Sequence, residues 1–155
     1  MTITAILAVL AVATGGPAAG FTVDRSVVAL PAWHRVGVDA WATFSRRADL
    51  GNGLVFYPIA GVSTWLLSIA TAVSYAIEGG ASTAAGAVYV AAGLAFAPAL
   101  ATSQAAPSML RIRDSHDKDD LTSALARFTR WNHIRAVAQS AAFAANLWAL
   151  VALLK

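Results

Sequence analysis

The sequence contains no cysteine, which excludes disulfide bonds, a thiol nucleophile, thiolate metal ligands and iron–sulfur clusters. Charge is also scarce. Asp, Glu, Lys and Arg make up 12% of the residues, against about 25% in a typical soluble domain. A phosphate-binding glycine loop, a GxSxG nucleophile turn and a haem-attachment motif are missing as well. The usual sequence signatures of soluble enzymes therefore give no guide to this chain.

Apolar residues dominate what is present. They make up 58% of the chain, and its mean hydropathy is +0.63. A soluble domain of this size has no interior for so much apolar surface, whereas a bilayer supplies an apolar solvent. We therefore predict one all-α domain over residues 1–155, an integral membrane four-helix bundle. The predicted spans are residues 2–23, 54–77, 81–106 and 134–154, and the first and fourth helices continue beyond the cytoplasmic face of the membrane.

The first apolar run, residues 2–21, has a rival interpretation as a cleaved signal peptide, because small residues lie near its end. A signal peptide should begin with basic residues, and none precedes this run. We therefore expect it to be a retained span. After it, apolar side chains recur at helical spacing among Asp39, Arg46 and Arg47. This pattern predicts an amphipathic helix over about 33–48, lying at the membrane interface that tryptophan favours.

The basic residues predict the orientation. Ten of the eleven lie within residues 24–53 and 107–135, which four spans place on the same side. By the positive-inside rule, the loops at 24–53 and 107–133 are cytoplasmic in a bacterial-type inner or plasma membrane, and both termini lie outside. The net charge of +3 then reflects the membrane leaflet. Because aspartates are interleaved with these cations, we expect no nucleic-acid partner.

The last predicted helix carries a polar face that runs into its apolar part. Its members recur at steps of four, three, four and seven, which places them on one side of a helix. They are Phe128, Asn132, Arg135, Gln139 and Asn146. Polar groups facing lipid are costly, so this face should point into the bundle. We expect Arg135 to form a structural ion pair with Asp24, which lies at the same depth on the first helix.

Two histidines add a chemical interpretation. His34 and His133 both fall just beyond the cytoplasmic membrane edge, and histidine is the side chain best suited to moving protons near neutral pH. With Arg135 they are the candidate catalytic residues. The candidate substrate-binding residues are Trp33, Trp131, Asn132 and Gln139. A metal site of the histidines with Asp24 or Asp39 lacks an HxxxH or ExxH spacing, so we expect no metal.

Four short motifs mark the helix ends. They are Leu30-Pro31-Ala32-Trp33 after a glycine-rich first helix, Leu50-Gly51 before Pro58 at the second span, Phe96-Ala97-Pro98 with Pro107 at the end of the third, and Trp131-Asn132 with Arg135 at the last. Together they resemble the anthrone oxygenase-like family of small four-helix membrane proteins. The resemblance covers nearly the whole chain.

The resemblance implies a four-helix membrane bundle and an oxidation reaction. Some fungal members of the family are linked to the oxidation of an anthrone to an anthraquinone by molecular oxygen, with no established cofactor. By that analogy the substrate is a hydrophobic aromatic or quinone-like molecule, oxygen is the co-substrate and no cofactor is needed. His34 or His133 would act as the base, Arg135 would stabilise the resulting anion and Asn132 would orient it.

The alternative is a non-enzymatic membrane scaffold or accessory subunit in which the polar cluster is structural. The partners would then be the lipid bilayer and a second copy of the chain or another membrane protein. Geometry separates the two interpretations. Convergence of His34 and Arg135 on a cavity open to the bilayer edge favours a site, whereas an Arg135 fully bonded to Asp24 in a closed bundle favours a scaffold.

Overall fold

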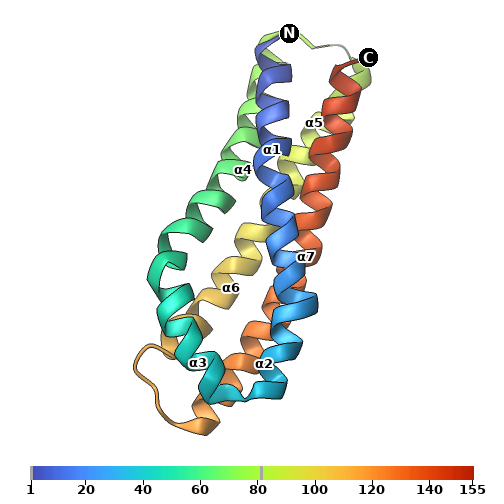
Figure 1. The fold of residues 1–155 in the computed structure, drawn as a ribbon. Helices are drawn as coiled ribbons and strands as arrows, with labels where there is room; N and C mark the ends of the chain where they lie inside the picture. Colours follow the sequence, from blue (N-terminus) through green and yellow to red (C-terminus); the bar gives the residue numbers. More distant parts are fainter. Residues whose placement is uncertain (1, 81) are drawn as a thin grey trace.

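The computed structural model describes residues 2–80 and 82–155, which form helices joined by short turns and contain no strand. Four long helical segments run side by side, with both termini at one end (Figure 1). Each is long and apolar enough to cross a membrane: Ile3–Val36, Val38–Ile77, Thr83–Arg111 and Lys118–Leu153. The predicted all-α, four-helix membrane bundle is confirmed.

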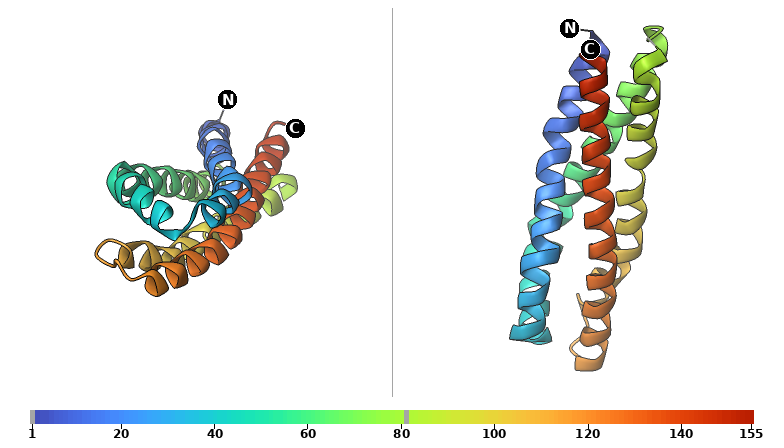
Figure 2. Two further views of the ribbon diagram at one scale, coloured as in Figure 1. Left: turned by 60° about the horizontal axis from the view of Figure 1, so that its bottom comes forward. Right: turned by 90° about the vertical axis from the view of Figure 1, so that its right-hand side faces the viewer.

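Kinks and π-helical turns divide three of these segments, and the last is a single unbroken helix. In chain order the elements are α1 (Ile3–Asp24), a first π-helical turn (Arg25–Ala29), α2 (Leu30–Val36), α3 (Val38–Arg47), a second π-helical turn (Ala48–Asn52), α4 (Gly53–Ile77), α5 (Ser82–Leu94), α6 (Ala97–Arg111) and α7 (Lys118–Leu153). We call the end that carries α2 and α3 the basic end, and the end with the chain termini the terminal end (Figures 1 and 2).

The first long helix packs through small side chains. Seven of its buried residues recur at steps of three and four, which places them on one face. They are Thr4, Ala8, Ala11, Gly15, Ala18, Thr22 and Ser26. A Cβ atom added to Gly15 would lie only 3.2 Å from Cγ2 of Thr64 on α4. In lipid, helices associate by such close packing, because the bilayer removes the usual hydrophobic drive.

The helix α7 lies against α1, α5 and α6, so it is the centre of the bundle. Its buried side chains again recur at steps of three and four. Phe128, Asn132, Gln139 and Asn146 are all among them, and Arg135 is half-buried. The prediction that this face points inward is confirmed for the four buried residues.

The predicted amphipathic helix over 33–48 begins later in the structure. The segment from Trp33 to Val36 continues the first long helix, which ends at Gly37. Gly37 has φ of 101°, a conformation that side chains with a Cβ disfavour, so the chain can turn sharply into α3 there. The helix α3 also packs against the bundle and is not only a surface helix. Trp41 is 1% exposed and its ring lies 6.1 Å from that of Phe128 on α7.

Candidate functional site

A cavity of about 500 Å³ lies between α1, α4, α6 and α7, in the half of the bundle nearer the basic end. This volume falls within the range of about 300–1,000 Å³ that is usual for small-molecule sites. Most of its wall is apolar. The large apolar side chains in the wall are Phe21, Leu50, Leu54, Val62, Met109, Leu110 and Phe128.

Kinks in two helices accompany this cavity. The helix α4 follows a turn in which Gly51 has non-helical angles, and it contains Pro58. The third long segment is interrupted between α5 and α6, just before Pro98. Proline removes a helical hydrogen bond and its ring clashes with the preceding turn, so it bends or breaks a helix. As a result, α4 and α6 barely touch over the length of the cavity, and its wall is open on that side.

The charged part of the cavity begins with an ion pair. Arg25 is bonded to Asp49, and their side chains are 14% and 4% exposed. The guanidinium of Arg25 also lies 5.3 Å from the ring centroids of both Tyr57 and Phe128. Cation–π contacts at this distance are favourable, particularly where water is excluded. Arg25 is therefore neutralised and held in place by its neighbours. The second carboxylate oxygen of Asp49, Oδ2, is buried and has no hydrogen-bond partner.

Arg135 has no such compensation. Its Nη2 donates a hydrogen bond to Oδ1 of Asn132 at 2.6 Å, and the Nδ2 of Asn132 in turn donates to Oγ of Ser26 at 2.8 Å. The Nε of Arg135 is buried without a partner. Within residues 2–80 and 82–155, the ion pairs are those of Arg25 with Asp49 and of Lys118 with Asp39. Arg135 thus lines an apolar cavity as a cation with no carboxylate bound to it.

The predicted ion pair between Asp24 and Arg135 is therefore wrong. Asp24 is exposed, although it lies at the expected depth. The reason is the rotation of the first helix. The inward positions at this level are Thr22 and Ser26, and a residue two positions from each points to the opposite side of a helix. The carboxylate that reaches the cavity is Asp49, from the second π-helical turn.

The three cavity side chains Arg25, Arg135 and Asp49 together carry one excess positive charge. A charge in a low-dielectric interior is costly unless an opposite charge or hydrogen bonds satisfy it. A further unsatisfied donor is Nε1 of Trp65, which is buried without a partner in a residue that lines the cavity. The site therefore offers two things to a ligand: an apolar wall and a cation that lacks an anion.

The structure divides the predicted site residues into two groups. Arg135 and Gln139 line the cavity, and Asn132 accepts a hydrogen bond from Arg135. The remaining four are not among its lining residues. Trp33 and Trp131 pack against the apolar cluster of the basic end. His34 and His133 are exposed, with Nε2 of His34 lying 3.2 Å from Oγ1 of Thr129. His34 and Arg135 do not converge on the cavity.

Sequence reasoning missed Arg25, Asp49, Tyr57 and Trp65. The two charged residues lie at the membrane edge, where charges usually mark the leaflet and need no other explanation. The sequence gives one indication for Asp49: its carboxylate comes shortly before the long apolar run of α4. Nothing in the sequence alone distinguishes Tyr57 or Trp65 from aromatic residues that face lipid.

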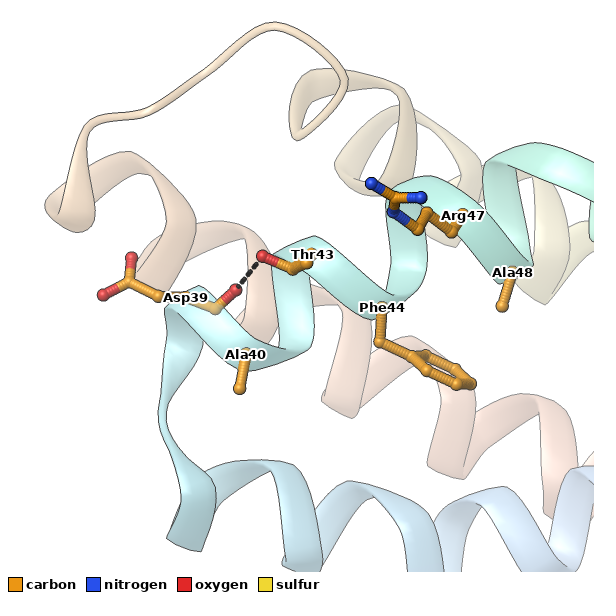
Figure 3. Close-up of a pocket in the computed structure, with 6 residues that line it drawn as sticks. All are labelled: Asp39, Ala40, Thr43, Phe44, Arg47 and Ala48. Carbon is orange, nitrogen blue, oxygen red and sulfur yellow. Dashed lines mark hydrogen bonds between the residues drawn. The ribbon is translucent and has the colours of Figure 1, made fainter.

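A second, shallower depression lies on the outer side of α3 (Figure 3). All six residues that line it come from α3 and the turn that follows: Asp39, Ala40, Thr43, Phe44, Arg47 and Ala48. The carboxylate of Asp39 and the guanidinium of Arg47 lie well apart in Figure 3, and the hydroxyl of Thr43 donates to the backbone carbonyl of Asp39 at 2.8 Å. Because no polar groups converge there, this depression is not the candidate site.

No group of three or more His, Asp or Glu side chains in the described part of the chain is placed to hold a metal ion. Comparison with protein-family models, curated proteins and solved structures gave no match to this chain. We therefore infer the function from the geometry of the cavity and from the sequence motifs.

Proposed function

We propose that the protein binds a hydrophobic aromatic or quinone-like small molecule in this cavity and oxidises it without a resident cofactor. One observation carries the binding part of the proposal: Arg135 lines an apolar cavity without a carboxylate partner. A ligand oxygen that is anionic, or becomes anionic during reaction, would supply the missing charge. The apolar rings of the ligand would replace lipid or water against the cavity wall.

The oxidation part is supported by the resemblance to the anthrone oxygenase-like family and by the second carboxylate oxygen of Asp49. We assign the base to Asp49, since it lines the cavity and its Oδ2 has no partner, whereas His34 and His133 lie outside the lining. Asp49 would accept a proton from an activated CH2 group of the substrate. Arg135 would stabilise the negative charge that moves onto the substrate oxygen.

The remaining steps need only molecular oxygen. The substrate anion gives electrons to oxygen, and a carbon–oxygen bond forms to yield a peroxide anion. Asp49 returns its proton to the outer oxygen of the peroxide, which gives a hydroperoxide. Loss of the remaining C–H proton to the Asp49 carboxylate then breaks the oxygen–oxygen bond, which leaves a carbonyl on the substrate and releases hydroxide. Hydroxide takes this proton from Asp49 and leaves as water. One oxygen atom thus enters the product and the other enters water, while the CH2 carbon is oxidised and oxygen is reduced.

We further propose that the basic end faces the cytoplasm of a bacterial-type inner or plasma membrane, with both termini outside. The support is the location of ten of the eleven basic residues toward that end of the bundle. The binding site then lies in the cytoplasmic half of the bilayer. Labelling of single cysteines added near the chain termini and in the loop at 112–117, from outside intact cells, tests this orientation.

Binding is tested directly with purified protein in lipid nanodiscs. We expect saturable quenching of tryptophan fluorescence by an anthrone or a hydroxylated quinone, and at least a tenfold loss of affinity in Arg135→Gln. Removing a charged partner from a buried hydrogen bond costs about 1.5–3 kcal/mol, which corresponds to that loss. The matched control is Arg130→Gln, an exposed arginine on the same helix, which should bind normally. Equal affinity in the two variants would rule out Arg135 as the anion contact.

Oxidation is tested by oxygen uptake with the same substrates. Asp49→Asn should lose uptake, because an amide does not accept the proton. Since the change also removes the carboxylate that pairs with Arg25, ligand binding by the same variant is the control for folding.

A scaffold function has one observation in its favour. Two of the inward polar residues of α7 form hydrogen bonds between helices, Asn132 with Ser26 and Asn146 with Oγ of Ser68. These bonds explain both residues without a ligand. If the wild-type protein shows no saturable binding of any anthrone, quinol or flavonoid-like compound, the scaffold interpretation is the better one.

A further inference from the structure

We infer that the ligand of this cavity is a bilayer-dissolved amphiphile with a single anionic group, and that it enters sideways through a window between α4 and α6. The inference rests on the proposed binding function. It adds the route by which the ligand arrives and the class of molecule that can take that route.

The window is defined by lining residues that are exposed on both helices. On α4 they are Leu54, Pro58, Gly61 and Val62, and on α6 they are Ala99, Thr102, Ser103, Ala106 and Leu110. Toward the terminal end the window is closed by an edge-to-face contact of Trp65 with Phe96, whose ring centroids are 5.3 Å apart. Toward the basic end the second π-helical turn contacts α6.

The window faces the part of the surface that would contact lipid. None of its exposed lining residues is charged, and several are small. On α4, the neighbouring Val55, Phe56 and Ile59 are 57–64% exposed, which is the pattern of a helix side in hydrocarbon. A molecule dissolved in the bilayer therefore meets an uncharged rim first.

On the other elements, the residues that line the cavity are buried or half-buried. At the basic end a buried apolar cluster lies beneath the cavity, and it includes Trp41, Ile112 and Phe128. Phe128 is at once a cavity wall and a member of this cluster. Toward the terminal end, the hydrogen bond of Ser68 with Asn146 ties α4 to α7. The side between α4 and α6 remains as the opening.

The polarity of the cavity fixes the orientation and class of the ligand. Its charged residues lie inside, on the two π-helical turns and α7, whereas its rim is uncharged. An amphiphile would therefore enter with its polar group leading and leave its apolar body toward the window. Because the cavity holds one excess positive charge, one negative charge on the ligand balances it, and a second would again be uncompensated. A cavity of about 500 Å³ suits one small molecule.

The first test places a bulky side chain in the window between α4 and α6. An added Cβ atom at Gly61 would meet nothing within 4 Å, so Gly61→Trp places its bulk in the opening without a backbone clash. The matched control is Gly86→Trp on α5, where space is equally free and which does not line the cavity. With a lipophilic hydroxyquinone in nanodiscs, stopped-flow fluorescence should show association at least tenfold slower for Gly61→Trp and unchanged for Gly86→Trp. Equal association rates for Gly61→Trp and the wild type would overturn the lateral route while the binding function stands.

The second test identifies the phase from which the ligand binds. The apparent Kd is measured at increasing lipid-to-protein ratio. Expressed as the mole fraction of ligand in the lipid, it should stay constant. Expressed as the total ligand concentration, it should rise. A sulfonated, water-soluble analogue should bind at least tenfold more weakly than the parent compound. Equal or tighter binding of the analogue would contradict the inference. If the wild type binds none of these probes, the proposed function itself fails.

Discussion

The two halves of this bundle are built from the same helices and differ in how closely those helices approach. Toward the terminal end, α4, α5 and α7 meet through small residues, and the buried cluster is mostly alanine. Toward the basic end, α4 contains Pro58 and the third long segment is interrupted just before Pro98. There α4 and α6 barely touch, and large side chains such as Trp41 and Phe128 fill part of the space. Small residues on uninterrupted turns close a membrane bundle, and prolines with bulky residues leave it open.

The halves also differ in how their polar groups are satisfied. In the terminal half, the hydroxyl of Thr4 donates to Ser74 at 2.9 Å, and that of Ser68 donates to Asn146 at 3.0 Å. In the cavity half, Arg135, Asp49 and Trp65 each keep a buried polar atom without a partner. Unsatisfied buried groups usually mark a functional site or an absent partner. The terminal half therefore supports the structure, and the cavity half is where a ligand would bind.

The largest effect is expected from Asp49→Ala, which leaves the guanidinium of Arg25 buried and unpaired. Breaking a buried ion pair from one side costs about 3–5 kcal/mol. Asp39→Ala is the matched control, because Asp39 pairs with Lys118 at 3.6 Å on the surface, where such pairs contribute about 0–1 kcal/mol. The free energy of unfolding in mixed micelles gives both values. Similar losses in the two variants would show that the Arg25–Asp49 pair is effectively solvated.

Ala91→Leu tests the close packing of the terminal half. Ala91 is buried in the alanine cluster, and overpacking such a site costs about 1–3 kcal/mol of unfolding free energy. The same substitution at Ala99, an exposed residue of the window, should change stability by less than about 0.5 kcal/mol. If the two substitutions cost the same, the contrast in packing between the halves is incorrect.

Arg135→Met should act in the opposite direction. In the absence of ligand, the unpaired charge destabilises the bundle, so its removal should raise the free energy of unfolding by about 1 kcal/mol. The same variant should lose ligand-dependent stabilisation. Thermal unfolding with and without ligand measures both effects. A lower stability of the ligand-free variant would mean that Arg135 has a structural role that its bond to Asn132 does not explain.

The smallest effect is expected from Ser68→Ala. The hydroxyl of Ser68 joins α4 to α7 through Asn146, and hydrogen bonds between membrane helices contribute about 0.6 kcal/mol on average. A double-mutant cycle with Asn146→Ala isolates this bond from the loss of packing. A coupling energy near zero would indicate that Asn146 is held by its other bond, to the carbonyl of Ala142 at 2.9 Å.

The bundle and the inward face of α7 could be predicted from the sequence because both follow from the apolar environment of the bilayer. Apolar runs of sufficient length must become helices, and polar residues such as Asn132 and Gln139 must turn away from hydrocarbon. The position of Asp24 shows the limit of that argument. Depth in the membrane follows from residue number, but the direction of a side chain depends on rotation, and Asp24 is two residues from the inward positions.

The cavity could not be predicted for a related reason. Pro58, Pro98 and Gly51 indicate that helices bend, but they do not indicate whether two bent helices move together or apart. The contribution of Asp49 depends on that bend, since a turn rather than a span carries it to the site. The two cavity residues that the sequence did identify, Arg135 and Gln139, lie on the one long segment without a break.

That unbroken segment gives the site a dependence on membrane thickness. The helix α7 has 36 residues, about 54 Å at 1.5 Å per residue, and a straight helix accommodates a thinner bilayer by tilting. The kinked α4 and α6 can change their bend instead. Hydrophobic mismatch would then alter the separation of these two helices while the rest of the bundle tilts as one body. Ligand association measured in short-chain and long-chain phosphatidylcholine nanodiscs should differ in the wild type and converge in Gly61→Trp.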